Sequence, residues 1–370
     1  MTTTPATITP ETGALPAGPG TVDAAVFDSA VVEAARVLLA DNKGLLAIDE
    51  SIPTCNSRFA RLGIPQTVQA RRAYRELIVT TPGLGDSIGG VIVCDETIRQ
   101  RTADGVSFPS VLHDAGIATG IKVDLGATPM AGHPGEKVTE GLDGLRDRLQ
   151  ESRQLGASFA KWRAVFTIGA STPSRASVVA NAHALARYVA LCQEAGLVPI
   201  GEPEVLMTGE HTLARCGQVT EEVLRVVFNQ LAEQAVVLEG MLLKPNMILP
   251  GLDCPIQDPV STVAQATRTC LRRAVPAAVA GITFLSRGQS GDLATTRLAA
   301  INSRTDPPLP WPVAFSFGRA IQQPALTIWG GQDAHATCAQ QALQQRVTAN
   351  RDARGGPGTH FERADDHHEY

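Results

Sequence analysis

The feature that most constrains the fold is a series of eight short apolar runs, spread along the chain between residues 44 and 318. Each run has the length and composition of a buried β-strand, and successive runs end roughly 30 to 45 residues apart. That spacing leaves room for a crossover helix each time, and near-continuous apolar strands are typical of a parallel sheet covered on both faces. The runs are residues 44–49, 89–94, 116–124, 159–166, 197–204, 241–247, 281–286 and 312–318.

The segments between the runs predict helices. Residues 220–232 place Val223, Val227 and Leu231 on one stripe, and a second helix is predicted after Asp258-Pro259. An amphipathic helix is also predicted over residues 29–40, ahead of the first strand. Eight strand–helix repeats in 370 residues predict a single (β/α)8 barrel, a fold whose active site lies at the carboxyl ends of the strands.

Both ends of the chain differ in composition from this repeating part. Residues 1–24 are rich in Thr, Pro and Gly and predict a flexible arm, and residues 349–370 are polar and Gly-containing and predict a mobile tail. The barrel is therefore assigned to residues 25–348. The first residues contain no basic or apolar segment that resembles a targeting peptide.

The bulk composition excludes several classes of partner. A net charge of −5 provides no basic field for nucleic acid, and no apolar run reaches the length of about eighteen residues that a membrane span requires. Seven scattered cysteines without a C-x-x-C motif indicate reduced thiols, which favours a cytoplasmic protein.

Three of the apolar runs close on pairs of charged residues two positions apart. Residues i and i+2 of a strand point to the same face, so the members of each pair project together. Ion pairs that merely satisfy one another are the structural alternative, but three successive pairs indicate a shared polar site at one end of the sheet. The pairs are Lys122 with Asp124, Lys161 with Arg163, and Glu202 with Glu204.

A further lysine, Lys244, interrupts the apolar run of residues 241–247. A lysine in such a run either extends its ammonium to water or stays buried with a lowered pKa, and a buried amine of lowered pKa is a nucleophile toward carbonyl carbon. Taken alone, a structural role for a lysine near a strand end is the commoner case; the neighbouring charged pairs favour Schiff-base chemistry.

The sequence contains no motif typical of several other kinds of catalytic or binding site. There is no P-loop, no G-x-S-x-G and no H-E-x-x-H, and the glycines at 83, 85 and 89 have the wrong spacing for a dinucleotide site. The eight histidines do not cluster at ligand spacing, so we expect no metal site and no cofactor.

Several uncommon sequence motifs occur in one order along the chain. Through them the chain resembles class I fructose-1,6-bisphosphate aldolases over residues 25–348 and at the closing tyrosine. They are Leu46-Ala-Ile-Asp-Glu-Ser51, Gly120-Ile-Lys-Val-Asp124, Phe159-Ala-Lys-Trp-Arg163, Glu202-Pro-Glu204, Leu242-Leu-Lys-Pro-Asn246, Thr283-Phe-Leu-Ser286 and Phe315-Ser-Phe-Gly-Arg-Ala320. The resemblance implies an (α/β)8 barrel, usually a homotetramer. It also implies metal-independent, reversible cleavage of fructose 1,6-bisphosphate, a step of glycolysis and gluconeogenesis, to dihydroxyacetone phosphate and glyceraldehyde 3-phosphate.

The resemblance also implies roles for individual residues. Lys244 is expected to form the Schiff base, with Lys161 as a second cation that lowers its pKa. Glu202 is expected to shuttle the proton for carbinolamine dehydration, with Glu204 beside it. Asp49 is expected to take the hydroxyl proton, and Tyr370 to assist proton transfer at the enamine carbon.

Two phosphates require two anion sites. The resemblance assigns the phosphate next to the ketone to Ser286, Arg287, Gly288, Ser316, Gly318 and Arg319. It assigns the other phosphate to Ser51, Thr54, Arg58, Lys122 and Arg163.

The chain departs from the family pattern at several of these places. Arg287 stands where the family usually has a glycine, so its side chain either points outward or adds a cation to the phosphate site. Phe317 replaces a common tyrosine, Thr54 stands for a serine, and Ser57 and Leu125 each replace a lysine, which reduces positive charge at the distal phosphate. The alternatives are another Schiff-base barrel, such as a transaldolase or an aldolase for a different sugar phosphate, and an inactive aldolase-like scaffold that binds protein.

Overall fold

The computed structural model describes Met1 and residues 24–303 and 306–356 of the chain. The predicted N-terminal arm, except Met1 and Ala24, lies outside the described residues, as does the end of the predicted tail with Tyr370.

Eight parallel strands close into a barrel, which confirms the predicted fold. Each strand is hydrogen-bonded to the next along the chain, and the last returns to the first. The strands are β1 (Gly44–Ala47), β2 (Ile88–Val93), β3 (Ala118–Lys122), β6 (Ala157–Phe166), β7 (Val198–Val205), β8 (Leu242–Leu243), β9 (Gly281–Phe284) and β10 (Val313–Phe317).

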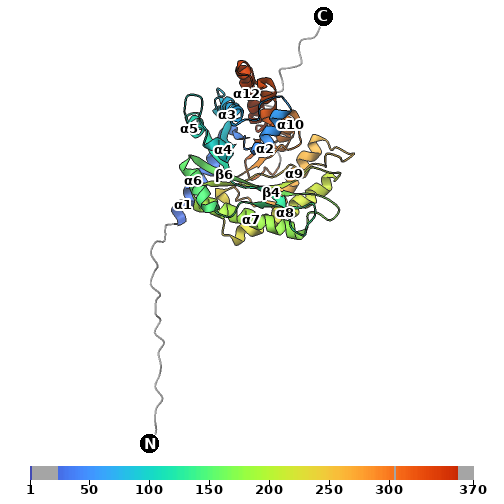
Figure 1. Cartoon of the computed structure of the whole chain (residues 1–370). Coiled ribbons are helices and arrows are strands. Elements are labelled where there is room, and N and C mark those ends of the chain that lie inside the picture. The colour runs from blue at the N-terminus through green and yellow to red at the C-terminus, as the bar shows by residue number, and fades with distance from the viewer. Residues whose placement is uncertain (2–23, 304–305, 357–370) are drawn as a thin grey trace.

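Helices surround the barrel on all sides (Figure 1). Within the described residues they are α1 (Ala24–Val37), α2 (Ile52–Ala60), α3 (Val68–Val79), α4 (Asp95–Ile98), α5 (Phe108–Asp114), α6 (Leu145–Gln154), α7 (Arg175–Glu194), α8 (Leu213–Glu233), α9 (Val260–Ala274), α10 (Gly291–Ile301), α11 (Arg319–Trp329) and α12 (Ala336–Ala353). None of them is long and apolar enough to cross a membrane. All seven cysteines lie in the described residues as free thiols, as expected.

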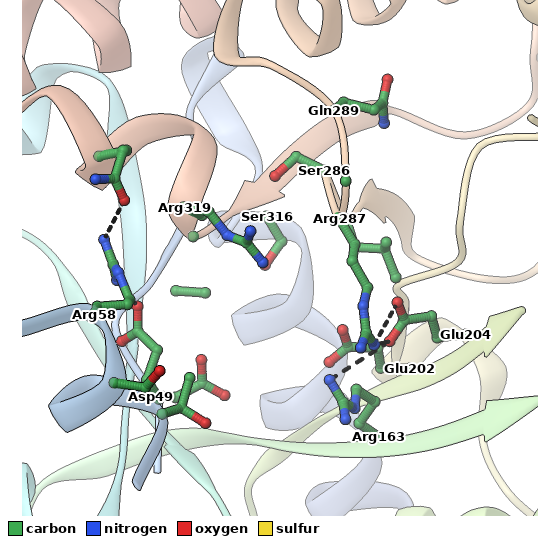
Figure 2. A pocket seen from close by; sticks show the side chains of 18 of the residues that line it. Asp49, Arg58, Arg163, Glu202, Glu204, Ser286, Arg287, Gln289, Ser316 and Arg319 are labelled. Atoms are coloured by element: carbon green, nitrogen blue, oxygen red, sulfur yellow. Dashed lines mark hydrogen bonds and ion pairs between the residues drawn. The ribbon is translucent and has the colours of Figure 1, made fainter. Parts of the chain in front are cut away.

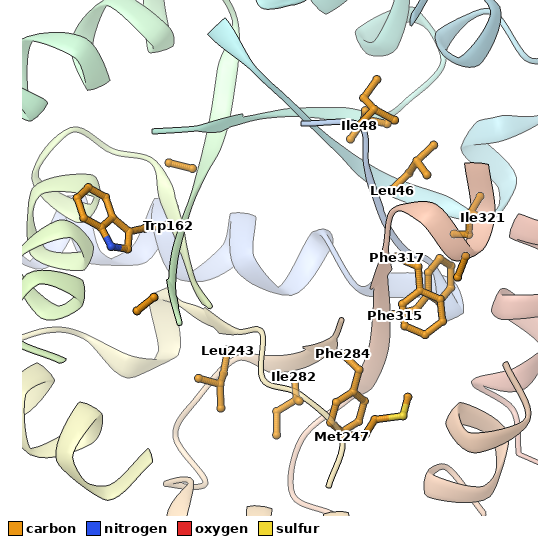
Figure 3. Close-up of a cluster of buried hydrophobic side chains, with 14 of the residues drawn as sticks. Leu46, Ile48, Trp162, Leu243, Met247, Ile282, Phe284, Phe315, Phe317 and Ile321 are labelled. Carbon is orange, nitrogen blue, oxygen red and sulfur yellow. The ribbon is translucent and has the colours of Figure 1, made fainter. Parts of the chain in front are cut away.

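Two apolar cores hold the barrel together. The larger fills the space between strands and helices, and Figure 3 shows part of it, with Trp162, Phe284 and Phe317 directed away from the barrel axis toward the helices. The smaller joins side chains such as Leu45, Phe159 and Leu242 to Val31 and Leu39 of the N-terminal segment, so that α1 packs against barrel residues.

Several predicted boundaries were wrong. The run of residues 241–247 forms a strand only at Leu242–Leu243, because Pro245 has no N–H for a ladder bond. Helix α8 begins at Leu213 instead of residue 220, since the Thr212 side chain caps it by accepting a hydrogen bond from the Arg215 N–H.

The predicted tail also begins too early. Helix α12 continues past residue 349 to Ala353, and Val347, Asn350 and Ala353 are buried against the barrel domain. Asn350 Oδ1 accepts a hydrogen bond from Thr295 of α10, so a polar residue that favoured a tail in the sequence is a packing residue in the structure.

One element was not predicted. The strands β4 (Gly126–Pro129) and β5 (Lys137–Glu140) pair antiparallel as a hairpin directly after β3. Their mixed polar composition lacks the apolar run that identified the barrel strands.

Candidate active site

A cavity of about 780 Å³ opens at the carboxyl ends of the barrel strands. It is lined by the ends of β1, β6, β7, β8, β9 and β10 and by the first helix after β1, and Figure 2 shows its charged side chains facing one another. The residues predicted for the site that line it are Asp49, Thr54, Arg58, Arg163, Glu202, Glu204, Lys244, Ser286, Arg287, Gly288, Ser316, Gly318 and Arg319.

The i, i+2 spacing on two neighbouring strands places the charged groups together. Arg163 of β6 is in register with Glu202 of β7, and Lys161 lies two residues earlier on β6. Lys244 follows β8 directly, where its N–H donates to the Gly201 carbonyl at 2.8 Å. Three adjacent strands thus bring two lysines, an arginine and two glutamates to one end of the barrel.

Lys161 is the most highly connected of these cations. Its Nζ lies 2.7 Å from Asp49, 3.3 Å from Glu202 and 4.0 Å from Asp124. Burial lowers the pKa of Lys161, but the three carboxylates outweigh burial and raise the pKa above its ordinary value. Lys161 is therefore held as an ammonium.

The pKa of Asp49 is shifted in the opposite direction to that of Lys161. Burial raises the pKa of this carboxyl, but Lys161 and Lys244 outweigh burial and lower the pKa to about 2. Asp49 is therefore ionised at neutral pH, at the end of β1.

Glu202 lies between the two lysines. One carboxylate oxygen is 3.5 Å from Lys244 Nζ and the other is 3.3 Å from Lys161 Nζ. Lys244 is only 4% exposed, so its amine reaches this shared carboxylate and the cavity instead of bulk water. An amine beside a carboxylate that can carry its proton is the arrangement required for imine formation.

Glu204 has a different set of partners. Arg163 Nη1 lies 3.6 Å from it, and Arg287 Nη1 donates to both of its oxygens at 3.0 and 2.9 Å. Burial raises the pKa of Glu204, and it remains raised although the two arginines lower it. The side chain of Arg287 thus turns into the site, toward an acid instead of toward solvent.

The edge formed after β9 and β10 has the features of an anion site. Helix α11 begins at Arg319 behind the cap residue Gly318, so its first N–H groups face the cavity together with Ser286 and Gly288. The buried Ser316 Oγ has no hydrogen-bond partner within the part of the chain that the structure describes, which leaves it available to a ligand.

The opposite edge is formed mainly by α2, which starts behind Ser51 with Pro53 in its first turn. Thr54 and Arg58 are one turn apart on this helix and both line the cavity. Arg58 is tied to Glu50 by an ion pair and donates to Gln322 at 3.1 Å.

Four predicted site residues are not in the lining. Lys161 is one of them, because it is buried and paired with Asp49 and Glu202. Ser51 lies beside the lining, in hydrogen-bond contact with Thr54 at 3.0 Å. Lys122 is bound to Asp124 at 2.7 Å and is outside the lining. Tyr370 lies outside the described residues.

Sequence reasoning missed other participants. Glu50 pairs with Arg58 and, at 2.9 Å, with the buried Arg75, and the signal was its position next to Asp49. Arg61 lines the cavity one helical turn after Ser57, a spacing that the predicted site did not use. In the described residues there is no group of three or more His, Cys, Asp or Glu side chains that could hold a metal ion.

Comparisons with known proteins identify the family of the chain. The family described as class-I fructose-bisphosphate aldolase matches residues 30–369. A probable fructose-bisphosphate aldolase class 1 of Xylella fastidiosa is 53% identical over 322 residues, covering 86% of this chain and 96% of the relative. A cytosolic fructose-bisphosphate aldolase of Arabidopsis thaliana is 47% identical over 329 residues, covering 89% and 91%.

A solved structure is similar throughout. The fructose-bisphosphate aldolase of Plasmodium falciparum superposes with a TM-score of 0.89 at 40% identity, covering 91% of this chain and 97% of that one.

Proposed function

The chain belongs to the class-I fructose-bisphosphate aldolase family, and we propose that its barrel site cleaves fructose 1,6-bisphosphate reversibly through a Schiff base on Lys244. The observation that carries this assignment is the buried Lys244 amine beside Glu202, with Lys161 on the other oxygen of the same carboxylate. Sugar phosphates are the substrates of the family.

The proposed reaction uses these groups in sequence. The Lys244 amine attacks the substrate ketone, and Glu202 carries the proton that leaves with the carbinolamine hydroxyl as water. The resulting iminium accepts the electron pair of the breaking C–C bond. The ionised Asp49 accepts the proton of the hydroxyl that becomes the aldehyde.

The enamine that remains must take up a proton before the imine is hydrolysed to dihydroxyacetone phosphate. We assign that step to Tyr370 by the family resemblance alone, because the tail lies outside the described residues.

Two anion sites support a bisphosphate substrate. The helix N-terminus at Arg319, with Ser286, Ser316 and Gly288, is suited to the phosphate next to the ketone. Thr54, Arg58 and Arg163 are suited to the other phosphate, and Arg61 supplies a cation one turn after the position where Ser57 replaces a lysine. We also propose a cytoplasmic homotetramer, as the family resemblance implies.

The decisive experiment traps the imine. The chain has five lysines, at 43, 122, 137, 161 and 244, so borohydride reduction with fructose 1,6-bisphosphate and peptide mass mapping can identify the modified amine. We expect the adduct on Lys244, and we expect Lys244→Met to abolish both adduct and cleavage while the protein stays folded.

A matched control is Lys137→Met, because Lys137 is an exposed residue of the β4–β5 hairpin. It should leave adduct and turnover unchanged. An adduct on Lys122 or Lys161 would contradict the assignment, no adduct would indicate an inactive scaffold, and equal efficiency with a monophosphate ketose would favour an aldolase for another sugar phosphate.

A further inference from the structure

Arg287 adds a cation to the site at a position where the resembled family usually has glycine. Its side chain leaves the turn after β9 and runs across the cavity to β7, where it meets Glu204 (Figure 2). Its two neighbours in the chain, Ser286 and Gly288, line the edge to which the ketone-side phosphate is assigned. The guanidinium therefore lies within one side chain's reach of two anions, the fixed Glu204 and an incoming phosphate.

We propose that Arg287 forms an ion pair with Glu204 in the unliganded site and that phosphate binding breaks this ion pair. In the unliganded site the guanidinium neutralises Glu204; the bound phosphate draws the guanidinium away, and Glu204 takes up a proton that it shares with Glu202. This inference rests on the proposed function, because it assumes a phosphate at the 286–288 edge.

The geometry favours movement of the arginine and not of the acid. Glu204 is 2% exposed and held in β7, whereas the Arg287 side chain is 42% exposed. Both contacts to Glu204 come from Nη1 alone, instead of the two-nitrogen fork that makes an arginine–carboxylate pair strong. A phosphate dianion offers three acceptor oxygens and can engage that fork.

The surroundings of Glu204 explain why release leads to proton uptake. Burial raises the pKa of the Glu204 carboxyl, and Arg287 and Arg163 lower it. Loss of the Arg287 contact therefore raises the pKa further. The titratable and charged groups around Glu204 are Arg163 on β6, Glu202 on β7, Lys244 after β8, Arg287 after β9 and Cys216 on α8.

The consequence for catalysis is a coupling between substrate binding and acid supply. A protonated carboxyl next to Glu202 replenishes the proton that carbinolamine dehydration consumes. Arg287 thereby acts as a positioning residue, because it touches the acid and the phosphate and not the reacting carbon.

The test measures phosphate binding by isothermal titration calorimetry with glycerol 3-phosphate, which has no carbonyl and forms no imine. Four proteins are compared: wild type, Arg287→Gly, Glu204→Gln and the double variant, each checked for folding by its thermal transition. Titrations in buffers of different ionisation enthalpy report proton uptake on binding. Any proton taken up by the phosphate group of the ligand itself is also measured in Arg287→Gly, which therefore serves as the control for it.

We expect wild type to take up protons on binding and both single variants to lose that uptake. Glu204→Gln should bind glycerol 3-phosphate about tenfold more tightly than wild type, because its arginine is already free. In the Arg287→Gly background the same glutamine substitution should change affinity less than twofold.

Three results would contradict the proposed breaking of the Arg287–Glu204 ion pair by phosphate. They are equal tightening by Glu204→Gln in both backgrounds, unchanged affinity and proton uptake in Arg287→Gly, and no binding of glycerol 3-phosphate to a wild type that still forms the borohydride adduct. Failure of that adduct would instead count against the proposed function. Arg287→Lys is a second variant, and it should preserve phosphate affinity better than Arg287→Gly does.

Discussion

At the scale of single residues, the surroundings of each charged group decide its protonation. Lys161 and Asp49 are 2.7 Å apart, and each holds the other in its charged form in spite of burial. Glu204 is paired with Arg163 and Arg287, but burial prevails there and its pKa stays raised. One site thus contains a permanent ammonium, a permanent carboxylate and a carboxyl of raised pKa, which is the range of groups that imine chemistry requires.

The lowered pKa of Asp49 predicts a pH-dependent part of the stability. The pKa of this carboxyl is lowered from its ordinary value of 3.8 to about 2 in the folded protein, so the unfolded state binds the proton first as pH falls. The stabilisation is complete above about pH 5 and is lost as pH falls through 3.8 toward 2; it is about 2 kcal/mol.

Urea unfolding of wild type and Asp49→Asn from pH 7 to pH 3 checks this sign. The difference between their free energies of unfolding should be constant above about pH 5. Below that pH, wild type should lose stability relative to Asp49→Asn. A difference that is flat across the whole range would show that Asp49 is not held by Lys161.

At the scale of elements, the barrel interior depends on glycines that leave room for one aromatic ring. A Cβ at Gly120 of β3 would come within 2.1 Å of the Phe159 ring, and one at Gly90 of β2 within 2.8 Å. Phe159 of β6 is fully buried, so it fills the space that these two strands leave open. Phe159 lies two residues before Lys161 on β6, so both side chains are on the same face of this strand.

Two Gly→Ala substitutions should therefore have opposite effects. Gly120→Ala should destabilise the protein by roughly 1–3 kcal/mol through overpacking. Gly217→Ala in α8 should be neutral or stabilising by up to about 1 kcal/mol, because its Cβ would meet Ile248 at an ordinary 3.5 Å. Thermal and urea unfolding measure both, and equal effects would mean that the Phe159 ring moves aside freely.

At the scale of the whole molecule, the residue that follows α12 joins this helix to the amino ends of two barrel strands. Arg354, just after α12, donates to the carbonyls of Val313 and Leu39 at 3.1 and 3.0 Å and also to Lys43. These residues lie at the amino ends of β10 and β1, opposite the active site. Tyr370 lies outside the described residues, and its role stays a prediction.

Removal of Tyr370 should separate imine formation from turnover. A variant ending at Glu369 should keep its stability and the borohydride adduct, since Lys244 and Glu202 are intact. Its turnover of fructose 1,6-bisphosphate should fall because enamine protonation slows, and cleavage of fructose 1-phosphate should suffer less. Identical bisphosphate turnover in the two proteins would remove Tyr370 from the proposed mechanism.

A chelator should leave activity unchanged, because an iminium on Lys244 is the proposed electron sink. The assay compares aldol cleavage before and after dialysis against EDTA. Loss of activity that zinc restores would assign the enzyme to metal-dependent chemistry.

The sequence by itself determined the features that follow from local periodicity. Eight apolar runs at crossover spacing predicted the closed barrel, and i, i+2 spacing predicted that Lys161, Arg163, Glu202 and Glu204 face one site, because side-chain direction alternates regularly along any strand. Local composition could not predict that β8 ends after two residues, that α12 continues into the polar tail, or that residues 126–140 form a hairpin.

Only the tertiary structure decided which partner each long side chain meets. Arg287 could have pointed outward, and its partner Glu204 lies 83 positions earlier in the chain. Glu50 joins Arg58 to Arg75. A loop arginine has several rotatable bonds and no periodic constraint, so its direction is set by the charges and packing that other segments bring near it.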